Sequence, residues 1–475
     1  MISRRRFLQS SVSLALVPLL PRVARSVTLS IRPSWDVFRT GPSFASFCSA
    51  VKSMKANTNA ADPASWSYWV SVHSQYCPHG KAYFLAWHRG FLYNFENQLR
   101  LASGDPTLVL PYWSYYDSPS IPDEFLDPSL PMYRSDRVGT NVASGLTLDA
   151  FASTIVNFQR GKPNAFEPVI EPLPHNNVHN LIGGAMSSVR ISPRDPIFWL
   201  HHANIDRLWV AWLKAGGGRT QPATKYAYWS GSFQYGSAIA TMPRAWTAST
   251  STQLGYVYDN QTMPNTLPPT GYIARAASSQ VGAMPVRPAT IQSVPLGVVR
   301  PLALDERSVS VDVTLTAQDA NRVRSGMLEA GTAAGSNQAG GPVRVVLDDV
   351  RLTSLGDKGG YFYNVYVNLP DPGAAGAPAQ AYLLGSFGPF EISVAKMQAG
   401  MKGAGMHDMQ GMAMPANQGG GARLVFPITD ALQRIWPTRL DRLTISFVRK
   451  DGRRQPTRGQ VIQVGGFHVE AYPSR

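Results

Sequence analysis

The chain has 475 residues, of which 44% are hydrophobic and 10% aromatic, so it can bury a sizeable core and is not wholly disordered. Its 44 basic and 30 acidic side chains give a net charge of +14. No basic stripe interleaved with aromatic residues occurs, which argues against a nucleic-acid-binding function. The two cysteines, Cys48 and Cys77, are too few for a disulfide-stapled fold or a cysteine-based metal site. This length favours two domains over one.

Residues 1–26 begin with three arginines, continue with a short apolar run and end in small residues. This pattern predicts a secretory signal, because the apolar run is too short to span a bilayer permanently. Arg5 and Arg6, followed by Phe7 and Leu8, resemble a twin-arginine signal, which exports folded proteins. We therefore expect a periplasmic or secreted protein without a stable membrane span after signal removal. A membrane-anchored N-terminus is the alternative.

Apolar residues recur at helical spacing in two long segments, 82–100 and 196–213. Both lie in a stretch rich in Trp, Tyr and Phe. They predict a mainly α domain over residues 27–260.

The composition then changes to Pro, Ala and Ser, which predicts a linker over residues 261–300. Alternating apolar residues farther on predict four strands, at Val309–Leu315, Val343–Leu347, Tyr361–Asn368 and Leu443–Val448. We expect a smaller, β-sandwich-like domain over residues 301–475.

Within that domain, residues 397–414 contain six of the 14 methionines, flanked by glycines and including His407. We expect this Met-rich loop to lie outside any core. Thioether groups prefer Cu(I) as a metal, so copper capture is one hypothesis for the loop. A surface insertion without a function is the other.

Seven of the nine histidines fall between residues 73 and 202. His175 and His179 are four residues apart, so on a helix their side chains share one face. His202 follows on another predicted helix face, and His73, His79 and His88 form an earlier group. Neither group has neighbouring carboxylate or cysteine ligand pairs, which favours two all-imidazole metal sites. Imidazole ligands suit Zn, Cu, Fe and Ni.

Two long motifs resemble the copper signatures of tyrosinases and polyphenol oxidases. The first runs from His79 through Phe84-Leu85-Ala86-Trp87-His88-Arg89 to Glu96, and the second from Asp195-Pro196-Ile197-Phe198-Trp199 through His202 to Asp206. The resemblance, to bacterial tyrosinases above all, covers about residues 32–260. A weaker resemblance extends to the C-terminal shielding domain of plant-type enzymes.

The resemblance implies a helix bundle that holds two copper ions. His73, His79 and His88 would bind the first ion, and His175, His179 and His202 the second. His201 would be a neighbour of these ligands, with a ligand role as the alternative. Arg89 and Asp206 would support the ligands by hydrogen bonding. Cys77 would form a thioether with His79, and the alternative is a free buried thiol.

The implied activity is the O2-dependent hydroxylation of monophenols and oxidation of o-diphenols to o-quinones. In plant-type relatives, the positions of Asn176 and Glu171 hold a water beside the second copper ion; Glu167 is a competing candidate. The alternatives are a catechol oxidase without monophenol hydroxylation and a non-catalytic oxygen carrier like the hemocyanins. A zinc hydrolase is disfavoured, because the chain has no His-Glu-x-x-His arrangement.

Three further expectations concern the surroundings of the site. The loop Gly183–Arg194 would form the rim of the pocket. It offers Met186 and Val189 and has no aromatic residue before Phe198, which predicts a more open entrance. Tyr256 and Tyr258 match a family motif at the end of the catalytic domain, with Arg32 as their cationic partner. The C-terminal domain would keep the enzyme latent, through a residue that the sequence does not identify. The sequence does not predict the oligomeric state or the natural phenol.

Overall fold

The computed structural model describes residues 29–268, 289–295, 301–332, 343–370, 379–403, 420–437, 439–453 and 455–471. The expected signal at 1–26 and the Met-rich residues 404–414 lie outside this part of the chain. So do residues 269–288 and 296–300 of the expected linker. The remaining part of that linker contains strand β5 (Ala289–Pro295), which pairs with β7, and the linker itself stays a prediction.

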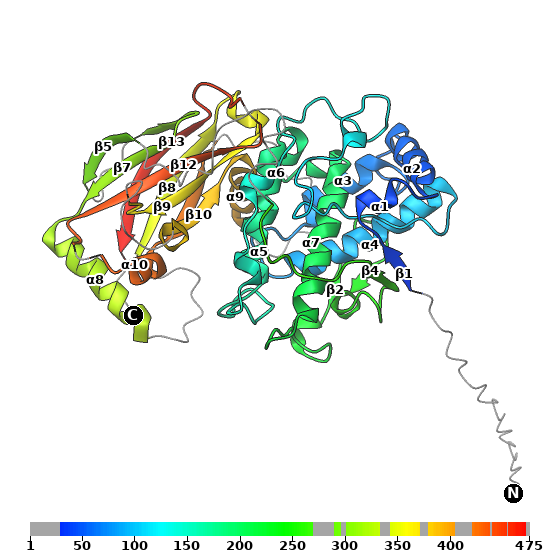
Figure 1. Ribbon diagram of the computed structural model, residues 1–475, viewed down its shortest axis with the longest axis horizontal. Coiled ribbons are helices and arrows are strands. Elements are labelled where there is room, and N and C mark those ends of the chain that lie inside the picture. Colours follow the sequence, from blue (N-terminus) through cyan, green and yellow to red (C-terminus); the bar gives the residue numbers. More distant parts are fainter. Residues whose placement is uncertain are drawn as a thin grey trace, which may run out of the picture.

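The first half of the structure is a group of helices around one aromatic-rich core (Figure 1). Four longer helices and shorter helical segments surround the histidines: α1 (Trp35–Phe38), α2 (Phe44–Ala56), α3 (Trp66–Tyr76), α4 (Phe84–Ser103), α5 (Glu167–Ile170), α6 (Asn177–Ile182) and α7 (Ile197–Lys214). Short strands complete this part: β1 (Ser30–Arg32), β2 (Ser232–Phe233), β3 (Met242–Pro243) and β4 (Tyr256–Tyr258).

Helices α4 and α7 form as their apolar spacing predicts. In α4 the buried stripe includes Phe84, Phe91 and Phe95, and the helix ends at Gly104, whose φ of 70° suits a glycine after a helix. Helix α7 begins directly after Asp195, whose carboxylate accepts the Ile197 N–H (3.0 Å). The same carboxylate receives two hydrogen bonds from Arg137. The start of α7, and with it the position of its histidines, is thereby fixed.

The second half contains two sheets that share one apolar core. The five-stranded sheet has the order β10-β9-β12-β7-β5 and the four-stranded sheet the order β11-β8-β13-β6. Their strands are β6 (Leu302–Leu304), β7 (Val309–Thr314), β8 (Val343–Leu352), β9 (Tyr361–Val367), β10 (Leu383–Phe387), β11 (Ala422–Pro427), β12 (Arg442–Asp451) and β13 (Ile462–Ala471), besides β5. Helices α8 (Ala317–Thr332), α9 (Pro389–Gly403) and α10 (Thr429–Ile435) accompany them. The expected order of a helical region followed by a sheet-rich region is confirmed, whereas the domain boundaries stay predictions.

Helix α9 connects the two halves, and Figure 1 shows it between the sheets and α6. Met397 in this helix is only 2% exposed and belongs to the core of the helical part. The prediction that residues 397–414 form a loop outside any core is therefore wrong for 397–403. The sequence pattern concealed this because glycines and methionines interrupt the apolar spacing of α9.

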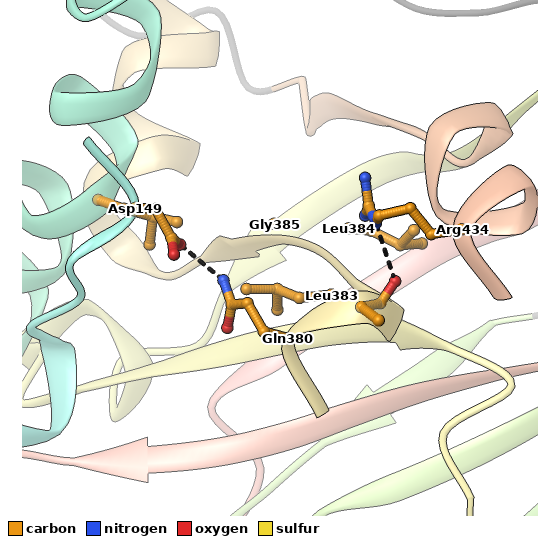
Figure 2. Close-up of a pocket in the computed structure, with 8 residues that line it drawn as sticks. Asp149, Gln380, Leu383, Leu384, Gly385 and Arg434 are labelled. Carbon is orange, nitrogen blue, oxygen red and sulfur yellow. Dashed lines mark hydrogen bonds between the residues drawn. The ribbon is translucent and has the colours of Figure 1, made fainter. Parts of the chain in front are cut away.

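The two halves also meet at a cavity of about 420 Å³, drawn in Figure 2. Gln380 Nε2 donates to Asp149 Oδ2 across this boundary (2.6 Å). Near the helical centre, Asn180 Nδ2 donates to Glu391 Oε2 (2.7 Å) and Ser386 Oγ to Asn177 Oδ1 (2.9 Å). These hydrogen bonds fix the sheet-rich part against α6. Among the described helices, none is long and apolar enough to cross a membrane.

Candidate binuclear metal centre

Six of the seven clustered histidines bring their Nε2 atoms together in two groups of three. In the first group, the Nε2 atoms of His79 and His88 each lie 3.3 Å from that of His73. In the second group, the Nε2 atoms of His175 and His179 lie 3.2 and 3.3 Å from that of His202. All six side chains are buried. The structure thus brings together each set of three that the sequence grouped.

The first group comes from two helices and the segment between them. His73 lies in α3 and its Nδ1 donates to the Val189 carbonyl (2.9 Å). His88 lies in α4, and its Nδ1 donates one turn back to the Phe84 carbonyl (2.7 Å). Because a carbonyl only accepts, these rings carry their proton on Nδ1 and present a lone pair at Nε2. His79 lies between the helices, with its Nδ1 3.4 Å from Glu171 Oε1.

The second group has a similar construction. His175 ends a π-helical turn, Glu171–Asn176, which continues into α6 with His179. The Nδ1 of His179 donates to the Met186 carbonyl (2.9 Å), and that of His175 lies 2.8 Å from the Asn176 amide oxygen. His202 comes from α7. These contacts again leave the Nε2 lone pairs of His175 and His179 directed at one another and at His202.

His201 also lies in the second group, because one nitrogen of each of its four histidines is within 4.8 Å of the others. Its ring is stacked on that of His175, with centroids 5.1 Å apart and planes at 20°. The Nε2 of His202 lies within 3.3 Å of the Nε2 atoms of both His175 and His179, whereas among the described residues His201 makes no such short contact with them. This geometry favours His202 over His201 as the third donor.

The two groups face each other across a narrow gap. The rings of His88 and His202 are stacked with centroids 4.5 Å apart, and those of His79 and His175 are 5.5 Å apart. Two cations bound by the two groups would therefore be neighbours. The arrangement is one binuclear centre, not two separate sites.

Burial lowers the pKa of five of these six histidines well below the ordinary value; they are His73, His88, His175, His179 and His202. Burial also lowers the pKa of His201 to about 3. The rings are therefore neutral at physiological pH. Lone pairs that face each other at 3.2–3.3 Å repel unless a cation lies between them. The donor set therefore fits two transition-metal ions.

A buried ion pair joins the two helices that carry His88 and His202. Arg89 Nε donates to Asp206 Oδ1 (2.6 Å), while the hydroxyls of Tyr256 and Tyr258 donate to Asp206 Oδ2 (2.7 and 2.6 Å). The guanidinium of Arg32 lies 3.6 Å from the ring centre of Tyr256, as the sequence predicted. Arg89 is paired with Asp206 and Arg32 with Glu96, so the buried charges are neutralised. The cluster joins α4 to α7 next to the proposed ligands.

Glu171 and Asn176 have different surroundings. Glu171 accepts the Gly80 N–H (2.5 Å) and a hydrogen bond from Arg160 Nη2 (2.5 Å), beside Nδ1 of His79. Asn176 contacts His175, and among the described residues no hydrogen bond joins it to Glu171. Glu167 accepts the N–H groups of Leu85 and Arg160, and burial raises its pKa to about 7. Glu171 thus lies beside His79 of the first group. Its spacing from His175 in the sequence did not indicate this contact.

The sequence did not identify the side chain that covers the centre. Phe390 of α9 is fully buried, and its ring stacks on that of His179 with centroids 4.2 Å apart. The same ring contacts His79 and His175 edge-on. Gln398 Nε2 donates to the His79 carbonyl (2.8 Å), and the Val189 N–H donates to Ser393 Oγ (3.2 Å).

The expectation of an open entrance is therefore wrong for the full chain. Met186 and Val189 are apolar and not aromatic, but both are buried. Helix α9 lies over the rim segment to which they belong. No signal within residues 183–194 could have revealed this, because the covering residue lies about 200 positions later.

The comparisons with known proteins agree with this geometry. The family model described as the common central domain of tyrosinase matches residues 63–145 and 128–215. Residues 63–215, about a third of the chain, are thus similar to this central domain. A tyrosinase of Hahella sp. is 34% identical over 192 residues, which are 31% of this chain and 39% of that protein. The latent form of a chloroplastic polyphenol oxidase of Prunus armeniaca is 30% identical over 274 residues, 43% of this chain and 45% of that protein.

The chain thus spans less than half the length of these two curated relatives. Among solved structures, that of latent apple tyrosinase is similar to this one, with a TM-score of 0.54 and 22% sequence identity. The alignment covers 94% of this chain and 98% of the apple chain. That likeness includes the sheet-rich part and concerns the fold. The tyrosinase family is a binuclear copper family, and the two histidine groups fit its two copper ions.

The buried neutral histidines predict that the metal-free protein loses stability in acid. An unfolded histidine titrates near pH 6.5, so below that pH the unfolded chain binds more protons than the folded one. The free energy of unfolding then falls as the pH is lowered, by about 1.4 kcal/mol per pH unit for each histidine kept neutral. Urea unfolding of metal-free protein between pH 7.5 and 5 measures this slope. H201N removes one such group and should reduce it; an unchanged slope in this variant would contradict the explanation.

Proposed function

We propose that this chain is a copper-dependent phenol oxidase. It would hydroxylate monophenols at the ortho position and oxidise o-diphenols to o-quinones with O2. The observation that carries the proposal is the pair of buried imidazole groups facing each other in a region similar to the central domain of tyrosinase. Catechol oxidation without monophenol hydroxylation is the alternative that the same centre supports.

In this proposal, His73, His79 and His88 hold one copper ion and His175, His179 and His202 the other. The bound copper pair supplies the binding and reduction of O2. Burial keeps His73, His88, His175, His179 and His202 neutral. Backbone carbonyls that accept from Nδ1 orient three of the rings, those of His73, His88 and His179. Arg89 and Asp206 hold α4 and α7 at a fixed separation, so the two groups keep their distance. His201 packs against His175 without serving as a ligand.

A phenol has a pKa near 10, so its hydroxyl proton needs an acceptor. We assign the orientation of a water to Asn176, which lies beside His175, and the acceptance of the proton to Glu171. Glu171 has the advantage over Glu167 of lying next to a proposed ligand, since its carboxylate is 3.4 Å from Nδ1 of His79. The carboxylate of Glu167 faces backbone N–H groups behind α4.

Cys77 is proposed to be joined to His79 by a thioether. The thiol is buried, follows α3 directly and precedes His79 by two residues. In forming the bond, the thiol S–H and one ring C–H give way to an S–C bond, and O2 accepts the two electrons and two protons. The link would hold His79, which lies outside both helices. A peptide containing both residues should then be lighter by two hydrogen atoms; the mass of the unmodified peptide would contradict the thioether.

The C-terminal part is proposed to make the full chain latent, with Phe390 as the blocking side chain. Its ring lies on His179 and against His79 and His175, where a phenol ring has to enter to reach both groups. Proteolysis between residues 261 and 300 would release it. Export by a twin-arginine signal is a further proposal, which rests on residues 1–26 alone.

The function and the latency are tested together by F390A. In the copper-loaded full chain, this variant should raise catechol turnover by about tenfold, equivalent to about 1.4 kcal/mol, and should also convert tyrosine. Quinone absorbance measures both rates. Absence of turnover with both substrates would contradict the phenol oxidase, and turnover of catechol alone would favour the catechol oxidase.

F387A is the matched control. Phe387 is equally buried, three residues away, but packs on Tyr363, Phe426 and Phe447 in the core of the sheets. The F387A variant should lose a similar free energy of packing, about 3–5 kcal/mol, without uncovering a histidine. Equal activation by the two variants would show that loosening of the sheet-rich part, and not removal of the Phe390 ring, opens the site.

A further inference from the structure

A groove of about 890 Å³ lies along α3, outside the metal centre. Helix α3 forms one wall, the end of α2 a second and residues 190–194 a third. We call it the α3 groove. Its side chains on α3 include Ser67, Ser71 and Ser74, which recur at helical spacing on one face. His73 leaves the same helix roughly 100° round from Ser74. The serine side of the groove is therefore turned away from the ligand, although Trp66 and Val70, which also line the groove, share the helical stripe of His73.

Four cations line the α3 groove, and no aspartate or glutamate does so: Lys55, Arg134, Arg190 and Arg194. Arg134 is paired with Asp136 through two hydrogen bonds. Lys55 donates to the carbonyl of Pro131, which is uncharged (2.6 Å). Among the described residues, neither Arg190 nor Arg194 forms an ion pair with a carboxylate. The groove thus holds two arginines, Arg190 and Arg194, that form no ion pair with a described carboxylate.

Lys55 is a partly buried cation of the groove. Burial is the main cause that lowers the pKa of its amine to about 8; Arg134 and Arg137 lower it further, whereas Asp195 and Asp136 raise it. The amine also lies 5.6 Å from the ring centre of Trp66. An anion in the groove would relieve the repulsion between these cations.

The lining between the cations combines an apolar surface with neutral polar groups, which include Asn57, Thr58 and Gln75. Trp66, Val70 and Ile191 contribute to it, with serine hydroxyls alongside. A volume of about 890 Å³ lies in the range of pockets for drug-sized organic molecules and far exceeds what one inorganic anion fills. Cations around an apolar surface are complementary to a molecule with an aromatic body and acidic substituents.

We propose that the α3 groove is a binding site for aromatic organic anions, separate from the metal centre. Arg190 and Arg194 bind the acidic groups, and the apolar residues of α3 and Ile191 contact the aromatic body. This site does not depend on the proposed oxidase activity.

The probe for this site is naphthalene-1,5-disulfonate, which is aromatic, dianionic and not a phenol. Calorimetric titration of the copper-loaded full chain at physiological ionic strength should show one saturable site with a Kd below about 1 mM. R190Q/R194Q should weaken binding at least tenfold. Absence of saturable binding to the unmodified protein would overturn the proposal.

Two controls distinguish the site from general attraction to a basic protein. R307Q/R439Q removes the same charge from arginines that are 77% and 82% exposed in the sheet-rich part, and should leave Kd unchanged. Equal weakening by both double variants would overturn the proposal. Inorganic sulfate should bind much more weakly than the disulfonate. Equal affinity of the two anions would contradict the proposal that the apolar surface contacts the aromatic body.

Discussion

The structure depends on the convergence of six imidazole nitrogens inside a closed aromatic core. Nitrogen lone pairs at 3.2–3.3 Å from one another are unfavourable without a shared cation, and burial lowers the pKa of five of the six rings, so that these do not gain protons instead. The chain maintains this arrangement with carbonyl acceptors on Nδ1 and with the ion pair between Arg89 and Asp206. Folding and metal binding are therefore coupled, because the interactions that orient the rings are also those that pack the helices.

Residues 188–194 connect three features of the molecule. The Val189 carbonyl fixes His73, the Val189 N–H contacts Ser393 of α9, and Arg190 and Arg194 line the α3 groove. A shift of α9 or of the groove lining would therefore also change the position of His73, one of the proposed ligands. The covering helix and the metal site share backbone contacts as well as the ring of Phe390.

The sequence predicted the parts of the structure that follow from local pattern. Helices α4 and α7, four of the strands (β7, β8, β9 and β12) and both histidine groups have short-range signals in spacing or motif. Phe390 has no such signal, because its position over His179 arises from the packing of the sheet-rich part on α6. The contact of Glu171 with His79 was hidden for the same reason, since it joins segments about 90 residues apart. Met397 and β5 lie in segments whose composition resembles loops although their backbone is regular.

The central claim is that the two groups of three histidines, with His202 and not His201 as the last donor, hold two copper ions. Elemental analysis of copper-loaded wild type, H202A and H201A tests it most directly, with the folded state of each checked by circular dichroism. The account predicts two copper ions per chain in wild type and in H201A, and one in H202A. Loss of an ion from H201A with full occupancy in H202A would contradict it, and so would a single ion in the wild type.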